Sequence, residues 1–153
     1  MHLAQFNIAK AKYQIDAPEI KEFFDNLDPI NKLAEQSDGF VWRLKDDSGD
    51  ATDFQAFSDP NIIVNMSIWE SVDALKNFMF RTHHMNFMRR KKEWFHKLSA
   101  DTYVLWWIPL GCTPSVEDAI ERLTYLRVNG DSPFAFTFKS NFSASESIQT
   151  NNA

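Results

Sequence analysis

The sequence contains little cysteine and little glycine, and both shortages exclude classes of function. Cys112 is the single cysteine, which rules out an internal disulfide and a metal site built from several thiolates. The chain has 4 glycines in 153 residues, and it contains neither a P-loop, nor G-x-G-x-x-G, nor G-x-S-x-G. H-E-x-x-H is also absent, and the neighbouring His83 and His84 cannot both reach one ion from a single helix face.

The chain also lacks an excess of positive charge and a long apolar run. Its formal net charge is −5, whereas general nucleic-acid binders depend on neutralising phosphates. No apolar run approaches the roughly 18 residues of a membrane span. The first ten residues alternate in polarity and do not form the charged-then-apolar pattern of a signal peptide. We therefore expect no nucleic-acid partner, no membrane partner and a cytoplasmic location.

What the sequence does contain is an alternation of strand and helix patterns. The hydrophobic periodicity predicts strands at residues 3–8, 40–44, 62–69 and 102–109, and helices at about 16–34, 71–95 and 115–127. We expect Asp16 to cap the first helix and Pro29 to kink or split it. Residues 134–138 are a candidate for a last short strand. The domain prediction is a single domain at 1–139, followed by a disordered tail at 140–153.

The order β-α-β-β-α-β predicts an α+β, ferredoxin-like protomer with an extra C-terminal helix. Such a unit carries helices on one face of its sheet and leaves the other face to be covered. The chain is rich in large aromatics, with 14 Phe and 5 Trp, and pairing with a second copy would bury them. We therefore expect a homodimer, because the free sheet face with Trp69 would otherwise be exposed.

The stretch RTHHMNFMRRKKEWF at residues 81–95 combines histidines, basic residues and aromatics. A helical wheel turns Arg89 and Arg90 outward beside Glu93, which favours an ordinary solvated face over a nucleic-acid patch. The same wheel places His84 in the apolar stripe with Lys91 two turns later. Two interpretations of His84 stay open at this point. It is either a core histidine or a pocket residue that serves as acid, base or axial ligand of a haem iron.

Polar side chains alternate with apolar ones along the strands. Ala4, Phe6 and Ile8 share an apolar face, as do Ile62, Val64, Met66 and Ile68, and we expect the helices to cover these faces. The opposite faces carry a second candidate site, to which Arg43 could add; its members are Gln5, Asn7, Asn65, Ser67 and Trp69. They would form either a polar-aromatic pocket or a wet sheet face and dimer seam.

Several blocks together resemble a known bacterial family. They are HLAQFNIAK, DGFVWRL, SIWESVDALKNFMFRTHHMNFMRRKKEWF and YVLWWIPLGCTPSVEDAIERLTYLRVNGDSPFAFTF. This combination, over about residues 2–139, is similar to the family called domain of unknown function 3291. The resemblance implies a dimeric α/β barrel, in the superfamily that includes antibiotic-biosynthesis monooxygenases and haem-degrading enzymes.

The resemblance also implies roles for individual residues. Haem-degrading members use an Asn on the first strand, a Trp on the second-half helix and a His further along it. Asn7 and His84 look like the first and last of these, but Phe78 occupies the Trp position and His84 comes about a turn early. Cofactor-free monooxygenases use Asn, Trp and Arg to bind a phenolic substrate and stabilise its anion, and Asn65, Trp69 and Arg43 are analogues by type.

The leading functional hypothesis is therefore a small-molecule enzyme of monooxygenase-like type that acts on an aromatic or polyketide-like compound. His84 and Asn7 would be catalytic, and the substrate-binding residues would be Gln5, Arg43, Asn65, Ser67, Trp69 and Lys91. The cofactor is either none or haem, with His84 as the possible iron ligand. The alternatives are a haem-binding protein and a non-catalytic module that binds a ligand or a partner.

Overall fold

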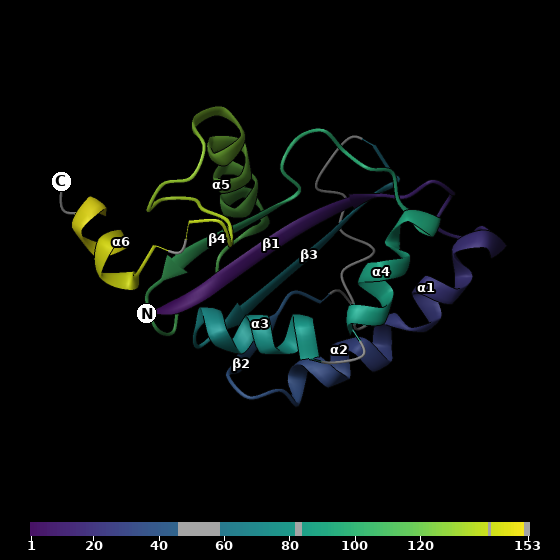
Figure 1. The fold of residues 1–153 in the computed structure, drawn as a ribbon, viewed down its shortest axis with the longest axis horizontal. Coiled ribbons are helices and arrows are strands. Elements are labelled where there is room, and N and C mark those ends of the chain that lie inside the picture. Colours follow the sequence, from purple (N-terminus) through teal and green to yellow (C-terminus); the bar gives the residue numbers. More distant parts are fainter. Residues whose placement is uncertain (46–58, 82–83, 141, 152–153) are drawn as a thin grey trace.

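The fold is built on a four-stranded antiparallel sheet with the order β2-β3-β1-β4 (Figure 1). The computed structural model describes residues 1–45, 59–81, 84–140 and 142–151, without the side chains of 81, 84–88 and 148–151. The strands are β1 (His2–Lys10), β2 (Phe40–Arg43), β3 (Ile62–Trp69) and β4 (Tyr103–Ile108). All four predicted strands are thus confirmed within a few residues.

Helices separate the strands in the predicted order. A 3₁₀ turn η1 (Pro18–Ile20), α1 (Lys21–Asp25) and α2 (Leu27–Glu35) join β1 to β2, whereas α3 (Val72–Arg81) and α4 (His84–Trp94) join β3 to β4. After β4 come α5 (Val116–Asn129) and α6 (Ala144–Asn151). The sheet order with these crossovers confirms the ferredoxin-like α+β fold.

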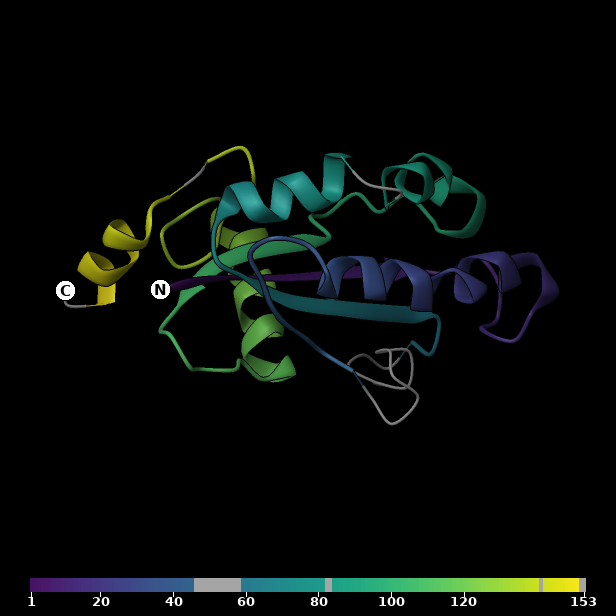
Figure 2. The ribbon, with the colours of Figure 1, turned by 90° about the horizontal axis from the view of Figure 1, so that it is seen from below.

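Helices lie on both sides of the sheet. Figure 2 shows α3 and α4 over one face and α5 across the other. In Figure 1, α1 and α2 lie along the side of the sheet on which β2 forms the edge. The chain therefore covers both faces of its own sheet, at least in part.

This arrangement corrects the expectation about the faces. The apolar face with Ala4, Phe6 and Ile8 packs against α5, through Ala119, Leu123 and Leu126. The face with the polar strand residues is the one that α3 and α4 cover. The reason lies in Leu3, Trp69 and Leu105, which share the polar face and supply the apolar contact that the crossover helices need.

The same finding removes the argument for a homodimer. Trp69 and Trp106 are each only 1% exposed in the single chain, so they do not require a partner to cover them. The homodimer itself stays a prediction.

The C-terminal helix on the apolar face begins as the sequence predicts. Ser115 Oγ accepts a hydrogen bond from the amide of Asp118 at 3.1 Å, and the Asp118 carboxylate accepts one from the Ser115 amide at 3.1 Å. This capping box satisfies two amide groups that the first turn of a helix leaves unpaired. It fixes the start of α5 and hence the register of the residues that cover the apolar face.

The first helical region differs in detail from the prediction. It breaks at Asn26, so that Pro29 lies in the first turn of α2, where its missing N–H leaves no hydrogen bond unmade. The predicted cap at Asp16 is wrong, because Ala17 precedes the 3₁₀ turn and no side chain caps it.

The C-terminal region also differs from the expected disordered tail. Phe142 packs on the cluster beside β4, and its carbonyl accepts a hydrogen bond from Trp107 Nε1 at 2.8 Å. Residues 144–151 then form α6, in which Ser147 is buried. Residues 134–138 form no regular strand, but Phe136 makes a single bridge to Leu105 of β4.

Gly39, between α2 and β2, lies close to α3, and a substitution at this position tests how closely the two segments pack. Its φ is +83°, and a Cβ added there would lie 2.5 Å from Cβ of Ala74 in α3. We expect Gly39→Ala to lower the free energy of unfolding by about 2–5 kcal/mol, from the positive φ and the steric overlap together. Gly111→Ala is the matched control, since its φ is +81° but no atom lies within 4 Å, and about 1–2 kcal/mol is expected there. Urea denaturation measures both, and equal losses would contradict this packing.

Candidate functional site

The helix-covered face of the sheet carries two successive rows of polar side chains. Antiparallel pairing places Arg43 opposite Ser67 and Ser67 opposite Gln5, which gives the first row. It also places Asn65 opposite Asn7, and Asn7 opposite Tyr103, which gives the second. We call these six residues the polar floor. Directly opposed residues point to the same side of a sheet, so the floor is one continuous surface.

Apolar clusters lie on both sides of the polar floor. On one side, Leu3, Trp69 and Leu105 pack with α2 and α3. On the other, Ala11 and Ile63 pack with Trp94, Phe95 and Ile20. The clusters are separate on the same face, and the residues that separate them along β1 and β3 are the polar ones. A face that is apolar at both ends and polar in the middle is suited to hold a ligand with an apolar body and polar groups.

Hydrogen bonds connect the members of the floor. Gln5 Nε2 donates to Asn65 Oδ1 at 2.6 Å and to Ser67 Oγ at 3.0 Å. Trp69 Nε1 also donates to Ser67 Oγ, at 2.9 Å. Exposure falls along this network, because Asn65 is exposed whereas Ser67 is 7% and Trp69 1% exposed. The floor therefore leads from solvent to a buried end at Ser67.

Arg43 brings a positive charge to the buried end. It is 8% exposed, and its Nε donates to Glu35 Oε1 of α2 at 2.8 Å. A buried guanidinium requires such a partner, since desolvating an unpaired charge is costly. Because Arg43 lies opposite Ser67, it belongs to the polar floor, as the sequence suggested but could not establish.

Aromatic rings form the wall beside the buried end. Phe78 of α3 stacks on Trp69 with ring centroids 5.3 Å apart, and Phe40 meets Trp69 edge-on at 5.5 Å. Phe78 is the residue that the family resemblance, as one of its implications, sets at the Trp position of haem-degrading enzymes. In this chain that position is 8% exposed and belongs to the apolar cluster.

Sequence reasoning missed two members of this region. Tyr103 joins the second row, and its hydroxyl accepts a hydrogen bond from the Phe138 amide at 3.2 Å. Glu35 pairs with Arg43 across a turn between α2 and β2. The alternation of YVLWWI could have placed Tyr103 on one face with Leu105, but it carried no signal for the strand register that sets Tyr103 beside Asn7.

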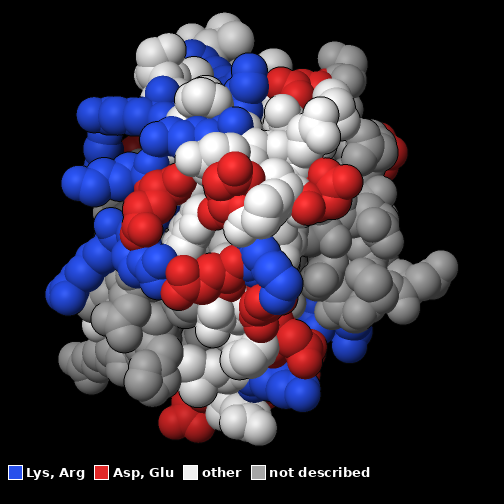
Figure 3. All heavy atoms as spheres, turned by 90° about the vertical axis from the view of Figure 1, so that its right-hand side faces the viewer, with Lys and Arg blue, Asp and Glu red and all other residues white. Residues whose placement is uncertain are grey.

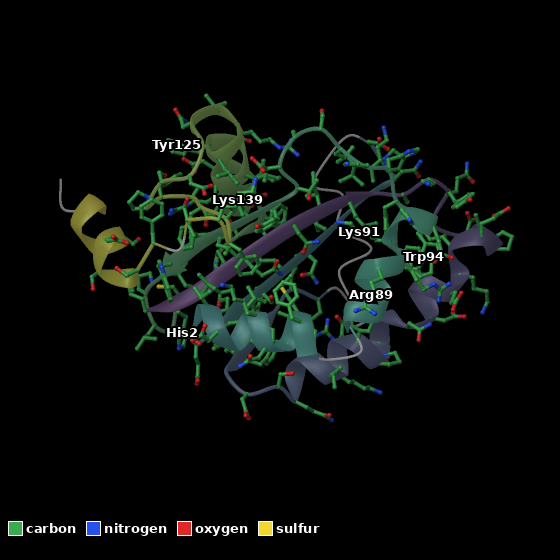
Figure 4. The ribbon with its side chains drawn as sticks, in the orientation of Figure 1. His2, Arg89, Lys91, Trp94, Tyr125 and Lys139 are labelled. Carbon is green, nitrogen blue, oxygen red and sulfur yellow. The ribbon has the colours of Figure 1, made fainter. Side chains whose placement is uncertain are left out.

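The basic stretch on α4 is mostly solvated, with one exception. Arg89 is exposed, as predicted, and Lys91 is exposed too, in contrast to its predicted place in the apolar stripe. Figure 4 shows Trp94 on the side of α4 that is toward α1. His84 is the first residue of α4, but its side chain lies outside the described residues, as does all of His83.

Arg90 is the exception, because it joins α4 to α1. Its Nη1 and Nη2 donate to the two carboxylate oxygens of Glu22, each at 2.8 Å, and its Nε donates to Glu93 at 2.7 Å. The guanidinium also lies 4.7 Å from the ring centre of Trp94. Figure 3 shows acidic side chains directly beside the basic ones on this end of the molecule. Arg90 thus helps to hold α4 against α1 next to the second apolar cluster.

Two kinds of feature are absent from the part of the chain that the structure describes. No group of three His, Cys, Asp or Glu side chains among them could hold a metal ion. Among the described helices, none has the length and apolar character that crossing a membrane requires.

The chain belongs to the family Domain of unknown function (DUF3291), whose model matches residues 2–152. A comparison with curated proteins found no match.

Several solved structures are similar to this chain. A conserved protein from Methanosarcina mazei Go1 is 11% identical with a TM-score of 0.54, over 71% of this chain and 94% of that one. SnoaB, a cofactor-independent oxygenase from Streptomyces nogalater, is 13% identical with a TM-score of 0.47, over 71% and 93%. A protein of unknown function from Nitrosomonas europaea is 14% identical with a TM-score of 0.48, over 74% and 95%. At 11% identity, the first of these supports the fold and nothing finer.

The contact between Glu22 and Arg90 predicts a pH dependence of stability. Hydrogen bonds from Arg90 lower the pKa of Glu22 below its ordinary value of 4.5, and they lower the pKa of Glu93 in the same way. A carboxyl whose pKa is depressed in the folded state adds stability above its unfolded pKa and loses it as the pH falls through the folded pKa. We expect wild type to be more stable than Glu22→Gln near neutral pH, with a difference that disappears as the medium becomes acidic.

Glu19→Gln, at an exposed neighbouring position, is the control and should show no such convergence. Urea denaturation over a pH series measures the three proteins. A Glu22→Gln difference that stays constant below the ordinary carboxyl pKa would refute the proposed contact.

Proposed function

We propose that this protein binds a planar aromatic molecule carrying hydroxyl or carbonyl groups on the polar floor, and that it oxygenates this molecule. The observation that carries the proposal is the polar floor itself, a connected set of amide and hydroxyl groups between two apolar clusters on one face of the sheet. A fold that only needed a core on this face would gain more from apolar side chains at these positions.

The groups of the floor suit oxygen atoms at the edge of an aromatic ring. In the described part of the chain, Asn7 and the Nδ2 of Asn65 are engaged by no other side chain, so their N–H groups are available as donors. Tyr103 lies opposite Asn7 in the same row, and its hydroxyl, which accepts a hydrogen bond from the Phe138 amide at 3.2 Å, also has a hydrogen to donate. The oxygens of a flat ligand would accept hydrogen bonds from these groups. Its ring would lie between the two apolar clusters, where burial of apolar surface contributes about 25 cal/mol per Å².

The proposed reaction converts a ring CH₂ group, flanked by phenolic rings, into a carbonyl. Both C–H bonds break, a C=O bond forms with one atom of dioxygen, and the other atom leaves as water with the two hydrogens. The carbon loses four electrons and dioxygen gains four, so substrate and dioxygen balance. The protein orients the ring and accepts the proton that the substrate loses. It also stabilises the resulting anion, which supplies the electrons to dioxygen.

One residue is proposed to stabilise the negative charge of the substrate anion, and another to accept the proton that the substrate loses. Arg43 places a guanidinium at the buried end of the floor, where it supports an anionic oxygen while Glu35 keeps it neutralised in the free protein. His84, which begins α4, is proposed as the base because an imidazole titrates near neutral pH. Lys91 is exposed, and we assign it no role in binding.

The first experiment measures oxygen uptake and product mass with dithranol, a dihydroxyanthrone. We expect catalysed uptake and a product with one oxygen more and two hydrogens fewer than the substrate. Asn65→Ala should lower kcat/KM about tenfold, as expected for one lost hydrogen bond of roughly 1–1.5 kcal/mol. Asn77→Ala, on an exposed position of α3, should leave kcat/KM unchanged.

If dithranol binds but no oxygen is consumed, the protein binds the ligand without oxygenating it, and the proposed oxygenase activity is rejected. An absorption spectrum of the purified protein with a haem band would favour haem binding instead.

A second experiment tests His84. An amide can keep a neutral hydrogen bond but does not titrate near neutrality or ligate iron as imidazole does. We expect His84→Gln to retain the wild-type melting temperature and to lose turnover. A stable variant with wild-type turnover would show that His84 is not the base, and a large fall in melting temperature would favour a core histidine.

A further inference from the structure

Ser67 stands out in the polar floor because its hydroxyl is buried and only partly used. The side chain is 7% exposed, and Oγ accepts hydrogen bonds from Gln5 Nε2 at 3.0 Å and from Trp69 Nε1 at 2.9 Å. A hydroxyl oxygen has two lone pairs and one hydrogen, so both acceptor positions are occupied. Within the described residues no acceptor receives the hydroxyl hydrogen. A buried donor of this kind is costly unless something bonds to it.

The neighbouring donors are already committed to the protein. Trp69 has one N–H group, which Ser67 accepts, and its ring is 1% exposed beneath Phe78. Gln5 uses its two amide hydrogens on Asn65 and Ser67. Neither residue can therefore donate these hydrogens to a ligand without breaking a bond inside the floor.

We infer that the Ser67 hydroxyl is the group that holds a negatively charged ligand oxygen, a phenolate or an enolate. Trp69 and Gln5 are positioning residues that act through Ser67. This inference rests on the proposed ligand class, but not on the oxygenation step.

The preference for an anion has a physical cause. Two N–H groups that donate to Oγ draw electron density from the oxygen, and chains of hydrogen bonds strengthen one another in this way. The hydroxyl hydrogen becomes a better donor, and a bond from it to a charged oxygen is about twice as strong as one to a neutral oxygen. Arg43, opposite Ser67, adds a positive charge that Glu35 at 2.8 Å largely offsets, so Ser67 is expected to be the main source of selectivity.

The experiment uses 4-nitrophenol, whose phenolate absorbs visible light and whose ionisation on the protein can therefore be read directly. We expect wild-type protein to bind the phenolate about ten- to a hundredfold more tightly than the neutral phenol, the range for a hydrogen bond to a charged group. The pKa of the bound probe is then lower than that of the free probe, because the site favours the deprotonated form.

Substitutions of Ser67 test whether its hydroxyl hydrogen causes the preference for phenolate. In Ser67→Ala the preference for phenolate over phenol should fall to within a fewfold, and the pKa of the bound probe should return toward its free value. Binding of 4-nitroanisole, which cannot ionise, should change little. Ser67→Cys keeps the size of the side chain but is a weak donor, so it should behave like Ser67→Ala and provides the readout if the alanine variant folds poorly. Ser67→Thr retains a hydroxyl and should recover much of the preference.

Trp69→Phe tests the indirect role. It removes the N–H group but keeps an aromatic ring in the cluster, and it should lower the phenolate preference without reducing the binding of 4-nitroanisole. Ser99→Ala, at an exposed position, is the control. It should leave the phenolate preference, the pKa of the bound probe and the binding of 4-nitroanisole unchanged from wild type.

The outcomes distinguish this inference from the proposed function. A phenolate preference that Ser67→Ala and Ser67→Cys both retain overturns the role of Ser67, even if dithranol is oxygenated. A Ser67-dependent preference supports it, even if no oxygen is consumed. Wild-type protein that binds neither probe overturns the inference together with the ligand class on which it rests.

Discussion

The alternation of side chains along β1 and β3 is the constraint on which the rest of the structure depends. Successive residues of a strand point to opposite faces, so the run from Leu3 to Ile8 must divide its side chains between two environments. Ala4, Phe6 and Ile8 form a continuous apolar face that α5 covers. Leu3, Gln5 and Asn7 lie on the other face, where one apolar residue is followed by two polar ones. This division lets one sheet have an uninterrupted core on one side and a polar floor on the other.

The crossover helices fit this interrupted face by packing at its two ends. Phe78 of α3 stacks on Trp69 at one end, whereas Trp94 of α4 packs with Phe23 of α1 at the other, with ring centroids 5.6 Å apart. Each end has its own apolar cluster, so neither helix needs apolar support from the residues between them. The contact of Arg90 with Glu22 and Glu93 adds a polar connection between α4 and α1. The floor can stay polar because the energy of packing comes from both sides of it.

The sequence predicted most of the fold, because strand and helix periodicities differ. IIVNMSIW gave β3 with its observed bounds, and the order of elements was sufficient for the ferredoxin-like fold. Which face the helices cover could not be predicted from polarity alone. Leu3, Trp69 and Leu105 provide the contact with the helices, and their alignment depends on a register between distant strands. Gln5, Asn65 and Ser67 were recognised as a group by alternation, but their hydrogen bonds, the pairing of Arg43 with Glu35 and the place of Tyr103 required that register.

The central claim is that the polar floor binds an aromatic ligand, and NMR of the side-chain amides tests it most directly. The Nε2 group of Gln5 and the Nδ2 groups of Asn7 and Asn65 report on the floor, whereas Asn77 and Asn129 lie at exposed positions on α3 and α5. During a titration with 4-nitrophenol, the account predicts saturable chemical-shift changes for the first three groups and none for the other two. Saturable changes confined to groups outside the floor would contradict it.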